Sequence, residues 1–256
     1  MSVDALIEIW RGEEQRPFRG WDFSHLRGRM VETDHPWSYQ ARAATLLDAA
    51  TAALDMDTGG GERLLALHPH WPGRIVATEA YPPNVRVAAA RLAPGGASLV
   101  VAACGATEPM PFASGAFDLV LNRHGGFNPR EVGRVLAVHG VFFTEQVHGL
   151  CVADLLAAFD VAPPANPGSA ERYVPELKAA GLQVARVEDW SGPLIFTDVG
   201  AVVAYLKAIP WLVPGFSVAT HAAHLLRLQE RLERDGELRF TYRVYLIEAQ
   251  KLRSTA

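Results

Sequence analysis

The sequence contains few of the features that mark secreted, membrane or metal-rich proteins. Its 256 residues include two cysteines, Cys104 and Cys151, which lack CxxC spacing, so neither a disulfide framework nor a cysteine metal site is predicted. No apolar run approaches the ~18 uncharged residues of a membrane span. The opening "MSVDALIEIW" lacks the basic and apolar regions of a secretory signal. We therefore expect a cytoplasmic protein with no membrane partner.

Positive charge is also scarce. The formal net charge is −4 at pH 7, whereas proteins that bind mainly to phosphates carry a positive balance, so nucleic acid is not an expected partner. Hydrophobic residues make up 49% and charged residues 20% of the chain, as in ordinary soluble domains. The length suits one α/β domain, and we expect a single domain over residues 1–256.

From residue 53 onward, short apolar segments alternate with segments of helical periodicity. The predicted strands are 53–57, 74–80, 98–104, 117–123 and 140–147. The predicted helices between them are 61–68, 82–94 and 129–140, and the last two open on proline. This alternation predicts an α/β fold with a doubly wound, mostly parallel sheet covered by helices on both faces.

The rest of the chain is arranged around this alternating core. Residues 1–44 are expected to form an N-terminal cap region that is irregular and aromatic-rich up to residue 40. Residues 45–150 are expected to form one half, and 151–256 are expected to form a C-terminal half. Within the latter, 191–236 is predicted to be a helical insertion ahead of the β-rich segment "LRFTYRVYLIEAQ".

Three consecutive glycines follow the first predicted strand, in "LDMDTGGGE". A glycine-rich turn between a strand and a helix exposes backbone N–H groups to an anionic or nucleotide-like ligand. No GK[ST] follows, so the turn is not a phosphate-binding P-loop. Glu79 ends the second strand 18 residues beyond Gly61, where a carboxylate can accept both hydroxyls of a ribose. Nicotinamide or flavin proteins and methyltransferases share this arrangement.

Four motifs in order separate these two classes. They are "LDMDTGGGE", the strand-end Glu79, "MPFASGAFDLVLNRH" and "EVGRVLAVHGVFFTEQV". Over residues 45–150 the chain resembles the class I S-adenosylmethionine-dependent methyltransferases, specifically the methyltransferase type 11 group. Four ordered motifs are much more specific than one glycine cluster.

The resemblance implies a Rossmann-like, seven-stranded, mostly parallel sheet in which 238–250 is the antiparallel strand. It also implies S-adenosylmethionine as the cofactor and methyl transfer to a small molecule as the reaction. The residues that it assigns to the cofactor are Tyr39, Asp55, Asp57, Thr58, Gly59, Gly61, Glu79, Ala80, Ala106, Thr107 and Arg123. For Arg123, a surface salt bridge is the alternative role, and for Tyr39 the alternative is packing against the sheet.

The chain departs from the family pattern at two of these positions. Asp57 stands where the family has its first glycine, and Ala106 stands where it has an aspartate that contacts adenine. An attenuated or non-catalytic cofactor-binding module is therefore the alternative prediction.

An RNA methyltransferase is disfavoured by the acidic balance. A nicotinamide oxidoreductase would need Tyr-xxx-Lys, but Tyr173 and Lys178 are five residues apart.

His124 is the predicted catalytic base, because it follows the fourth strand, where ligands of open α/β sheets bind. A base is needed only if the acceptor must lose a proton. The alternative is a loop histidine that orders the turn or contacts the methionine part of the cofactor.

The insertion at 191–236 is aromatic, with Phe196, Tyr205, Trp211 and Phe216. Aromatic walls suit a small, partly apolar acceptor, although a homodimer interface or ordinary core packing explains the same residues. The histidine pairs "HPH" and "HAAH" lack HExxH and neighbouring cysteine ligands, so no metal site is predicted.

Overall fold

The computed structural model describes the whole chain except residues 19–22, 106, 108 and 254–256. Contacts divide the chain into two compact units. The sheet unit comprises Pro36–His148, Gly168–Trp190 and Val244–Ala256. The second unit comprises Met1–His35, Gly149–Pro167 and Ser191–Arg243. The expectation of one domain with a cap region and an insertion stays a prediction.

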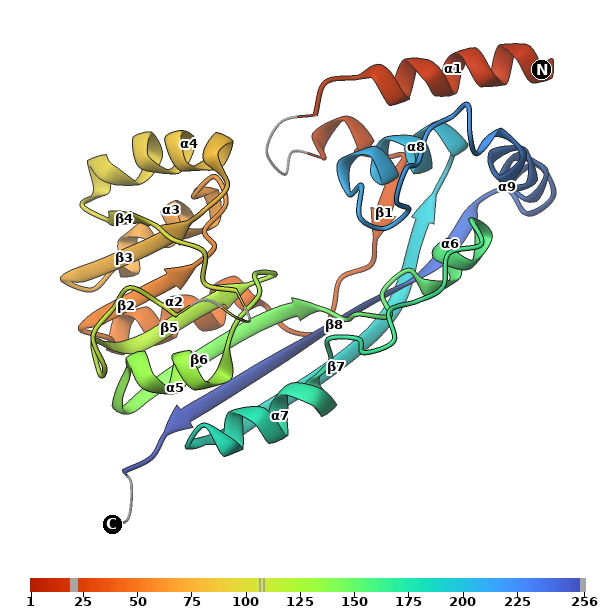
Figure 1. Ribbon diagram of the computed structural model, residues 1–256. Coiled ribbons are helices and arrows are strands. Elements are labelled where there is room, and N and C mark those ends of the chain that lie inside the picture. The colour runs from red at the N-terminus through yellow and green to blue at the C-terminus, as the bar shows by residue number, and fades with distance from the viewer. Residues whose placement is uncertain (19–22, 106, 108, 254–256) are drawn as a thin grey trace. The chain divides into compact units, whose positions relative to one another are not determined.

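The sheet unit contains the expected doubly wound sheet (Figure 1). In spatial order its strands are β4 (Ser98–Val101), β3 (Arg74–Glu79), β2 (Ala52–Met56), β5 (Phe117–Arg123), β6 (Leu136–Val147), β8 (Leu238–Lys251) and β7 (Leu182–Phe196). The pairs among the first five strands are parallel, and β8 is antiparallel to β6. The mostly parallel sheet and its late antiparallel strand are therefore confirmed.

The sheet has eight strands rather than seven. The additional strand is β1 (Met30–Glu32), which pairs antiparallel with the last residues of β7, and both paired segments belong to the second unit. Predicting this pairing from the sequence would have required matching two segments about 160 residues apart. Local periodicity carries no such information.

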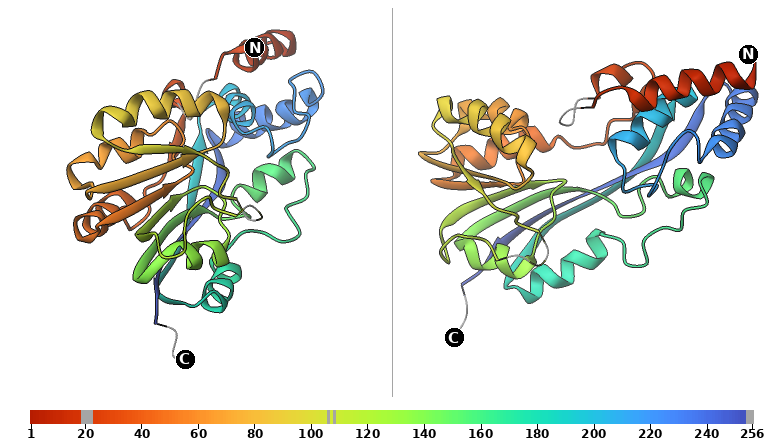
Figure 2. Two further views of the ribbon diagram at one scale, coloured as in Figure 1. Left: turned by 60° about the vertical axis from the view of Figure 1, so that its left-hand side comes forward. Right: turned by 45° about the horizontal axis from the view of Figure 1, so that its top comes forward.

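Helices cover both faces of the sheet. Tyr39, in α2 (Tyr39–Ala49), stacks on Phe143, whereas Phe142 belongs to a core cluster with residues of α5 (Pro129–Val135) and α7 (Ala170–Ala179). Because successive strand residues point to opposite faces, α2 lies on one face and α5 and α7 lie on the other. α3 (Glu62–Ala66) and α4 (Pro82–Leu92) contact each other, and α4 contacts β3 and β4 (Figure 2).

The predicted helix 129–140 ends five residues early. Leu136 is fully buried and pairs with Phe117 in the sheet, so the segment after Val135 extends as β6. Tertiary pairing here overrides a helical periodicity that continues in the sequence. The remaining short 3₁₀ turns are Ser24–Leu26, His68–His70 and Ala93–Gly95.

The second unit has a helical core of its own. Its helices are α1 (Val3–Gln15), α6 (Ala153–Ala158), α8 (Val199–Ala208) and α9 (Ala222–Asp235). The prediction that residues 1–40 are irregular was wrong for α1, which Ser2 caps and which buries Leu6 and Trp10 one turn apart. The Ser2 cap and this i, i+4 apolar pair are the sequence signals that predict such a helix.

Two features stabilise this second core. The guanidinium of Arg29 donates two hydrogen bonds to Asp198, at 2.7 and 2.8 Å, and a third to Glu13 at 2.7 Å. Although burial opposes the shift, these bonds lower the pKa of Asp198, whose carboxylate also caps α8. Phe196 and Tyr205 are buried with ring centroids 5.5 Å apart, so these two insertion aromatics form core rather than an exposed wall. Trp211 is 64% exposed.

In the described part of the chain, every helix is too short or too polar to cross a membrane.

We expect Gly61→Ala to destabilise the protein. Gly61 has φ +81° at the start of α3, and an added Cβ would lie 2.9 Å from Cγ of the buried Leu92. A left-handed alanine that also clashes costs about 1–3 kcal/mol. The free energy of unfolding from urea titration measures the loss. Gly73→Ala is the control, because open space surrounds its Cβ position, and its effect should stay within about 0.5 kcal/mol. Equal effects of the two substitutions would contradict this account.

Candidate functional site

Most of the predicted site residues lie at or just after the carboxyl ends of parallel strands. Asp55 pairs with Ala77, Met56 with Asn122, and Arg123 with Glu145. β2, β3, β5 and β6 therefore end at one edge of the sheet, where α/β proteins bind their ligands.

The glycine loop is a tight turn fixed to β3. The backbone N–H of Asp57 donates to Thr78 Oγ1 at 3.1 Å, and that of Thr58 donates to the Thr78 carbonyl at 2.8 Å. Asp57, Gly59 and Gly61 have φ values of 53°, 63° and 81°, in the left-handed region that glycine adopts at no steric cost. The loop backbone thus follows the pattern that the glycines predict, with an aspartate at its first left-handed position.

Glu79 ends β3 and is 6% exposed. Its Oε1 accepts hydrogen bonds from the backbone N–H groups of Ala80 at 2.9 Å and Tyr81 at 2.8 Å. These bonds fix the carboxylate at the strand end, immediately before α4. Ala80 acts through its backbone, and its own side chain is exposed.

The Asp57 carboxylate extends from β2 toward the loop after β5. A Cβ on Gly125 would lie 2.7 Å from Asp57 Oδ2, so only glycine at 125 leaves room for this side chain. Burial raises the pKa of Asp57 to about 6; the nearby Glu79 charge adds to the shift and the Cys104 backbone N–H opposes it. Burial likewise raises the pKa of Asp55 to about 7, opposed by the Thr58 side chain.

A buried carboxylate organises the β5–β6 side of this edge. Glu145 is 1% exposed; its Oε2 accepts from Trp37 Nε1 and its Oε1 from Arg123 Nε, each at 2.8 Å. His124 Nε2 lies 3.7 Å from Oε1, and the His124 backbone N–H donates to the Glu145 carbonyl at 2.9 Å. Arg123 therefore forms an ion pair with a buried carboxylate, not the surface salt bridge considered from the sequence.

Tyr39 lies beside this cluster. Its ring stacks on Phe143 with centroids 4.9 Å apart, and the Arg123 guanidinium lies 6.0 Å from its ring centre. Burial, then the charges of Asp55 and Glu145, raise the pKa of Tyr39 well above its usual value. The Tyr39 hydroxyl is buried and has no hydrogen-bond partner among the described residues.

The predicted residues thus form two neighbouring groups. Asp55, Asp57, Thr58, Gly59, Gly61 and Glu79 surround the ends of β2 and β3, whereas Tyr39, Arg123 and His124 gather around β5 and β6. Thr107 is exposed in the loop after β4, and Ala106 lies outside the described residues.

Sequence reasoning missed three residues at this edge: Glu145, Cys104 and Asn122. Asn122 is fully buried and accepts a 2.9 Å hydrogen bond from Thr144 Oγ1 and another from Gln146 Nε2. Polar residues at the end of an apolar strand were the available signal in "LVLNR" and "FFTEQV".

Solved structures share the fold of this chain. A "putative methyltransferase" from Bacillus halodurans C-125 is 17% identical, with a TM-score of 0.57 over 83% of this chain and 99% of that chain. A functionally unknown protein from Deinococcus radiodurans R1 is 15% identical, with a TM-score of 0.58 over 97% and 98%. A "putative sarcosine dimethylglycine methyltransferase" from Galdieria sulphuraria is 15% identical, with a TM-score of 0.52 over 83% of each chain.

The chain has the class I methyltransferase fold. Its strand order and its antiparallel β8 agree with the resemblance found in the sequence motifs. No family model and no curated protein sequence matches the chain. At 15–18% identity the likeness establishes the fold, and the reaction is a separate question.

We expect Asp57→Asn to stabilise the protein increasingly as the pH rises. The pKa of Asp57 is about 6 in the folded protein, above the ordinary value of 3.8. Because Asp57 ionises less readily in the folded state, its contribution to stability is fully present below pH 3.8 and is lost as the pH rises through 6. The gain from the substitution should grow by about 1–3 kcal/mol between pH 4 and pH 8. Urea unfolding across this range measures it. The exposed Asp34→Asn is the control, and a pH-independent gain at Asp57 would contradict the burial argument.

Proposed function

We propose that the protein transfers a methyl group from S-adenosylmethionine to a small, partly apolar acceptor. The observation that carries the proposal is Glu79, held at the end of β3 by two backbone N–H groups in a methyltransferase fold. A carboxylate fixed there can accept the two hydroxyls of a ribose. The other strand ends supply further polar groups around it.

The residues present fit the cofactor. Gly59 carries no side chain in the loop that leaves β2, and the buried Tyr39 hydroxyl has a free hydrogen-bonding capacity among the described residues. Glu79 would hold the ribose, and the loop backbone from Thr58 to Gly61 would hold the methionine part. The cofactor supplies a methyl group bonded to a positively charged sulfur, and this sulfur becomes the neutral thioether of the leaving group.

The chain's own contribution is mainly positioning. Methyl transfer needs the acceptor and the methyl group in line at close range. For an acceptor that loses a proton, His124 would take it, because the Glu145 carboxylate 3.7 Å away stabilises a protonated imidazole. Arg123, fixed by the same carboxylate, would orient an acidic group nearby.

Glu79→Gln should weaken binding of S-adenosylhomocysteine. Replacing the carboxylate removes charge-assisted hydrogen bonds worth about 1.5–3 kcal/mol, or roughly 10–100-fold in Kd. Isothermal titration calorimetry measures the change. Glu176→Gln, an exposed substitution on the other face of the sheet, should leave Kd unaltered. No binding to the wild-type protein at millimolar ligand would end the proposal.

Asp57→Gly should tighten the same binding by about tenfold. The substitution restores the family's glycine, removes a partly desolvated carboxylate, and suits the left-handed φ of 53°. The same titration tests it, and weaker binding would show instead that the carboxylate contacts the ligand. Binding with no labelled methyl product from any acceptor in either form would favour the non-catalytic alternative.

A further inference from the structure

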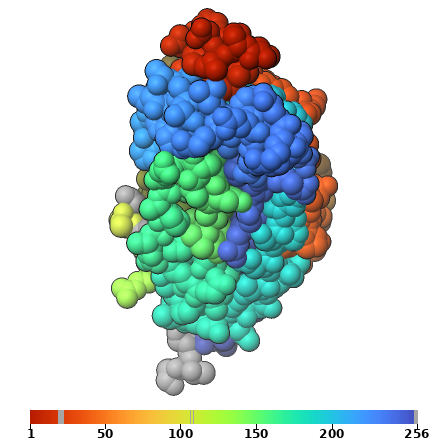
Figure 3. Space-filling model, turned by 90° about the vertical axis from the view of Figure 1, so that its right-hand side faces the viewer, coloured from red at the N-terminus to blue at the C-terminus, as the bar shows by residue number. Residues whose placement is uncertain are grey.

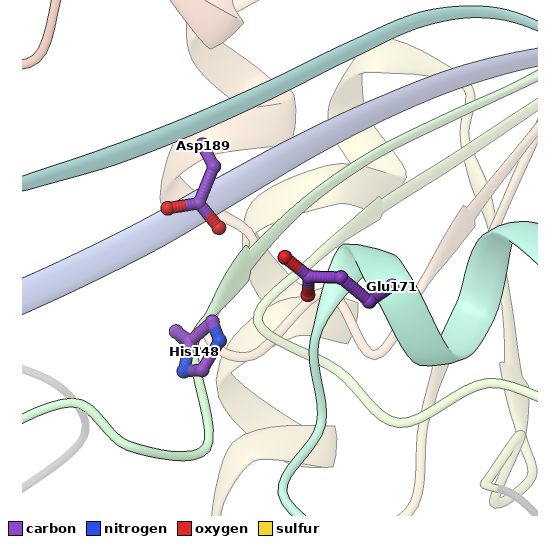
Figure 4. Close-up of side chains that lie close together, drawn as sticks. All are labelled: His148, Glu171 and Asp189. Carbon is purple, nitrogen blue, oxygen red and sulfur yellow. The ribbon is translucent and has the colours of Figure 1, made fainter.

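Three potential metal ligands converge in the sheet unit, and none of them is among the residues assigned to the cofactor. His148, Glu171 and Asp189 each place a nitrogen or oxygen within 4.8 Å of the others (Figure 4). They come from the end of β6, the first turn of α7, and β7. Figure 4 shows the three side chains pointing toward one another.

Local structure explains this convergence. Residues 142, 144, 146 and 148 alternate onto the face of β6 that α5 and α7 cover, which directs His148 toward α7. Ser169 caps α7 by accepting the Arg172 backbone N–H at 3.3 Å, and this fixes Glu171 in the first turn. The ring of Tyr245 packs edge-on against His148 at 6.2 Å, and His148 is 5% exposed.

We propose that His148, Glu171 and Asp189 bind a divalent first-row transition metal ion such as Zn²⁺ or Mn²⁺. One imidazole and two carboxylates form a mixed nitrogen and oxygen donor set, which suits these ions better than Mg²⁺ with its preference for oxygen alone. Two carboxylates balance the charge of a divalent cation. The proposal does not depend on methyl transfer.

The distances are close to those of a bound site. Ligands at ~2.1 Å from one ion lie ~3.0–3.4 Å apart at octahedral or tetrahedral angles, so side chains within 4.8 Å of one another need to close by at most about 1.5–2 Å. His148 is buried and provides a fixed ligand, whereas Glu171 and Asp189 are exposed and can adjust to the ion. The segment that contains α7, in teal, is at the surface in the space-filling view, which allows water to complete the coordination (Figure 3).

The rival explanation is a histidine–carboxylate hydrogen-bond network without an ion. Both explanations predict that the three side chains cluster. Only the metal site predicts a saturable affinity for a cation that depends on both carboxylates.

The test uses the full chain after removal of metals with a chelator. Zn²⁺ and Mn²⁺ are titrated separately by calorimetry, and bound Mn²⁺ is counted by electron paramagnetic resonance. The variants are Glu171→Gln, Asp189→Asn and the double substitution, with circular dichroism to verify folding. Glu188→Gln is the matched control, since its side chain leaves β7 on the opposite face from Asp189.

We expect one ion per wild-type chain and a loss of affinity greater than about tenfold in each carboxylate variant. The Glu188→Gln control should bind as the wild type does. Absence of binding would overturn the proposal. So would binding that is equal in the wild type and the double variant, because that result assigns the ion to other histidines. Both single variants replace exposed side chains, so each remains informative even if the double variant fails to fold.

Discussion

Parallel pairing of β2, β3, β5 and β6 is the constraint on which the site depends. Each strand is apolar along its length and carries polar groups where it ends, and the pairing brings those ends to one edge. Residues as distant in sequence as Asp57, Glu79 and Glu145 thereby share one region. The hydrophobic strand interiors stabilise the arrangement, while the ends carry the chemistry.

This edge concentrates carboxylates, and each is held by different contacts. Glu145 meets the guanidinium of Arg123 and the indole N–H of Trp37, which supply the charge and hydrogen bonds that a buried carboxylate requires. Asp57 instead is partly buried and lies near a second carboxylate, Glu79, and burial followed by the Glu79 charge raises the pKa of Asp57 to about 6. The edge therefore contains one carboxylate that is paired with Arg123, Glu145, and one whose ionisation near neutral pH destabilises the fold, Asp57.

The sequence predicted those features of the fold that depend on residues near one another in the chain. Strand and helix alternation predicted the doubly wound sheet, and the motif at 54–62 predicted a glycine-rich turn between a strand and a helix. The eighth strand and the end of α5 at Val135 depend on pairing with distant segments. Helical periodicity alone could not reveal them. The Arg123–Glu145 ion pair joins residues 22 apart and needed the β5–β6 register to be known.

Alternation along β6 assigns its polar residues to two separate environments. Glu145 belongs with Phe143 on the face that α2 covers, where it meets Trp37 from the segment before that helix. Thr144, Gln146 and then His148 follow Phe142 on the face covered by α5 and α7. A substitution on one face therefore removes no direct contact on the other. The second face still reaches the strand ends of the site, because Thr144 and Gln146 donate hydrogen bonds to Asn122 at the end of β5, and His148 follows them along the chain.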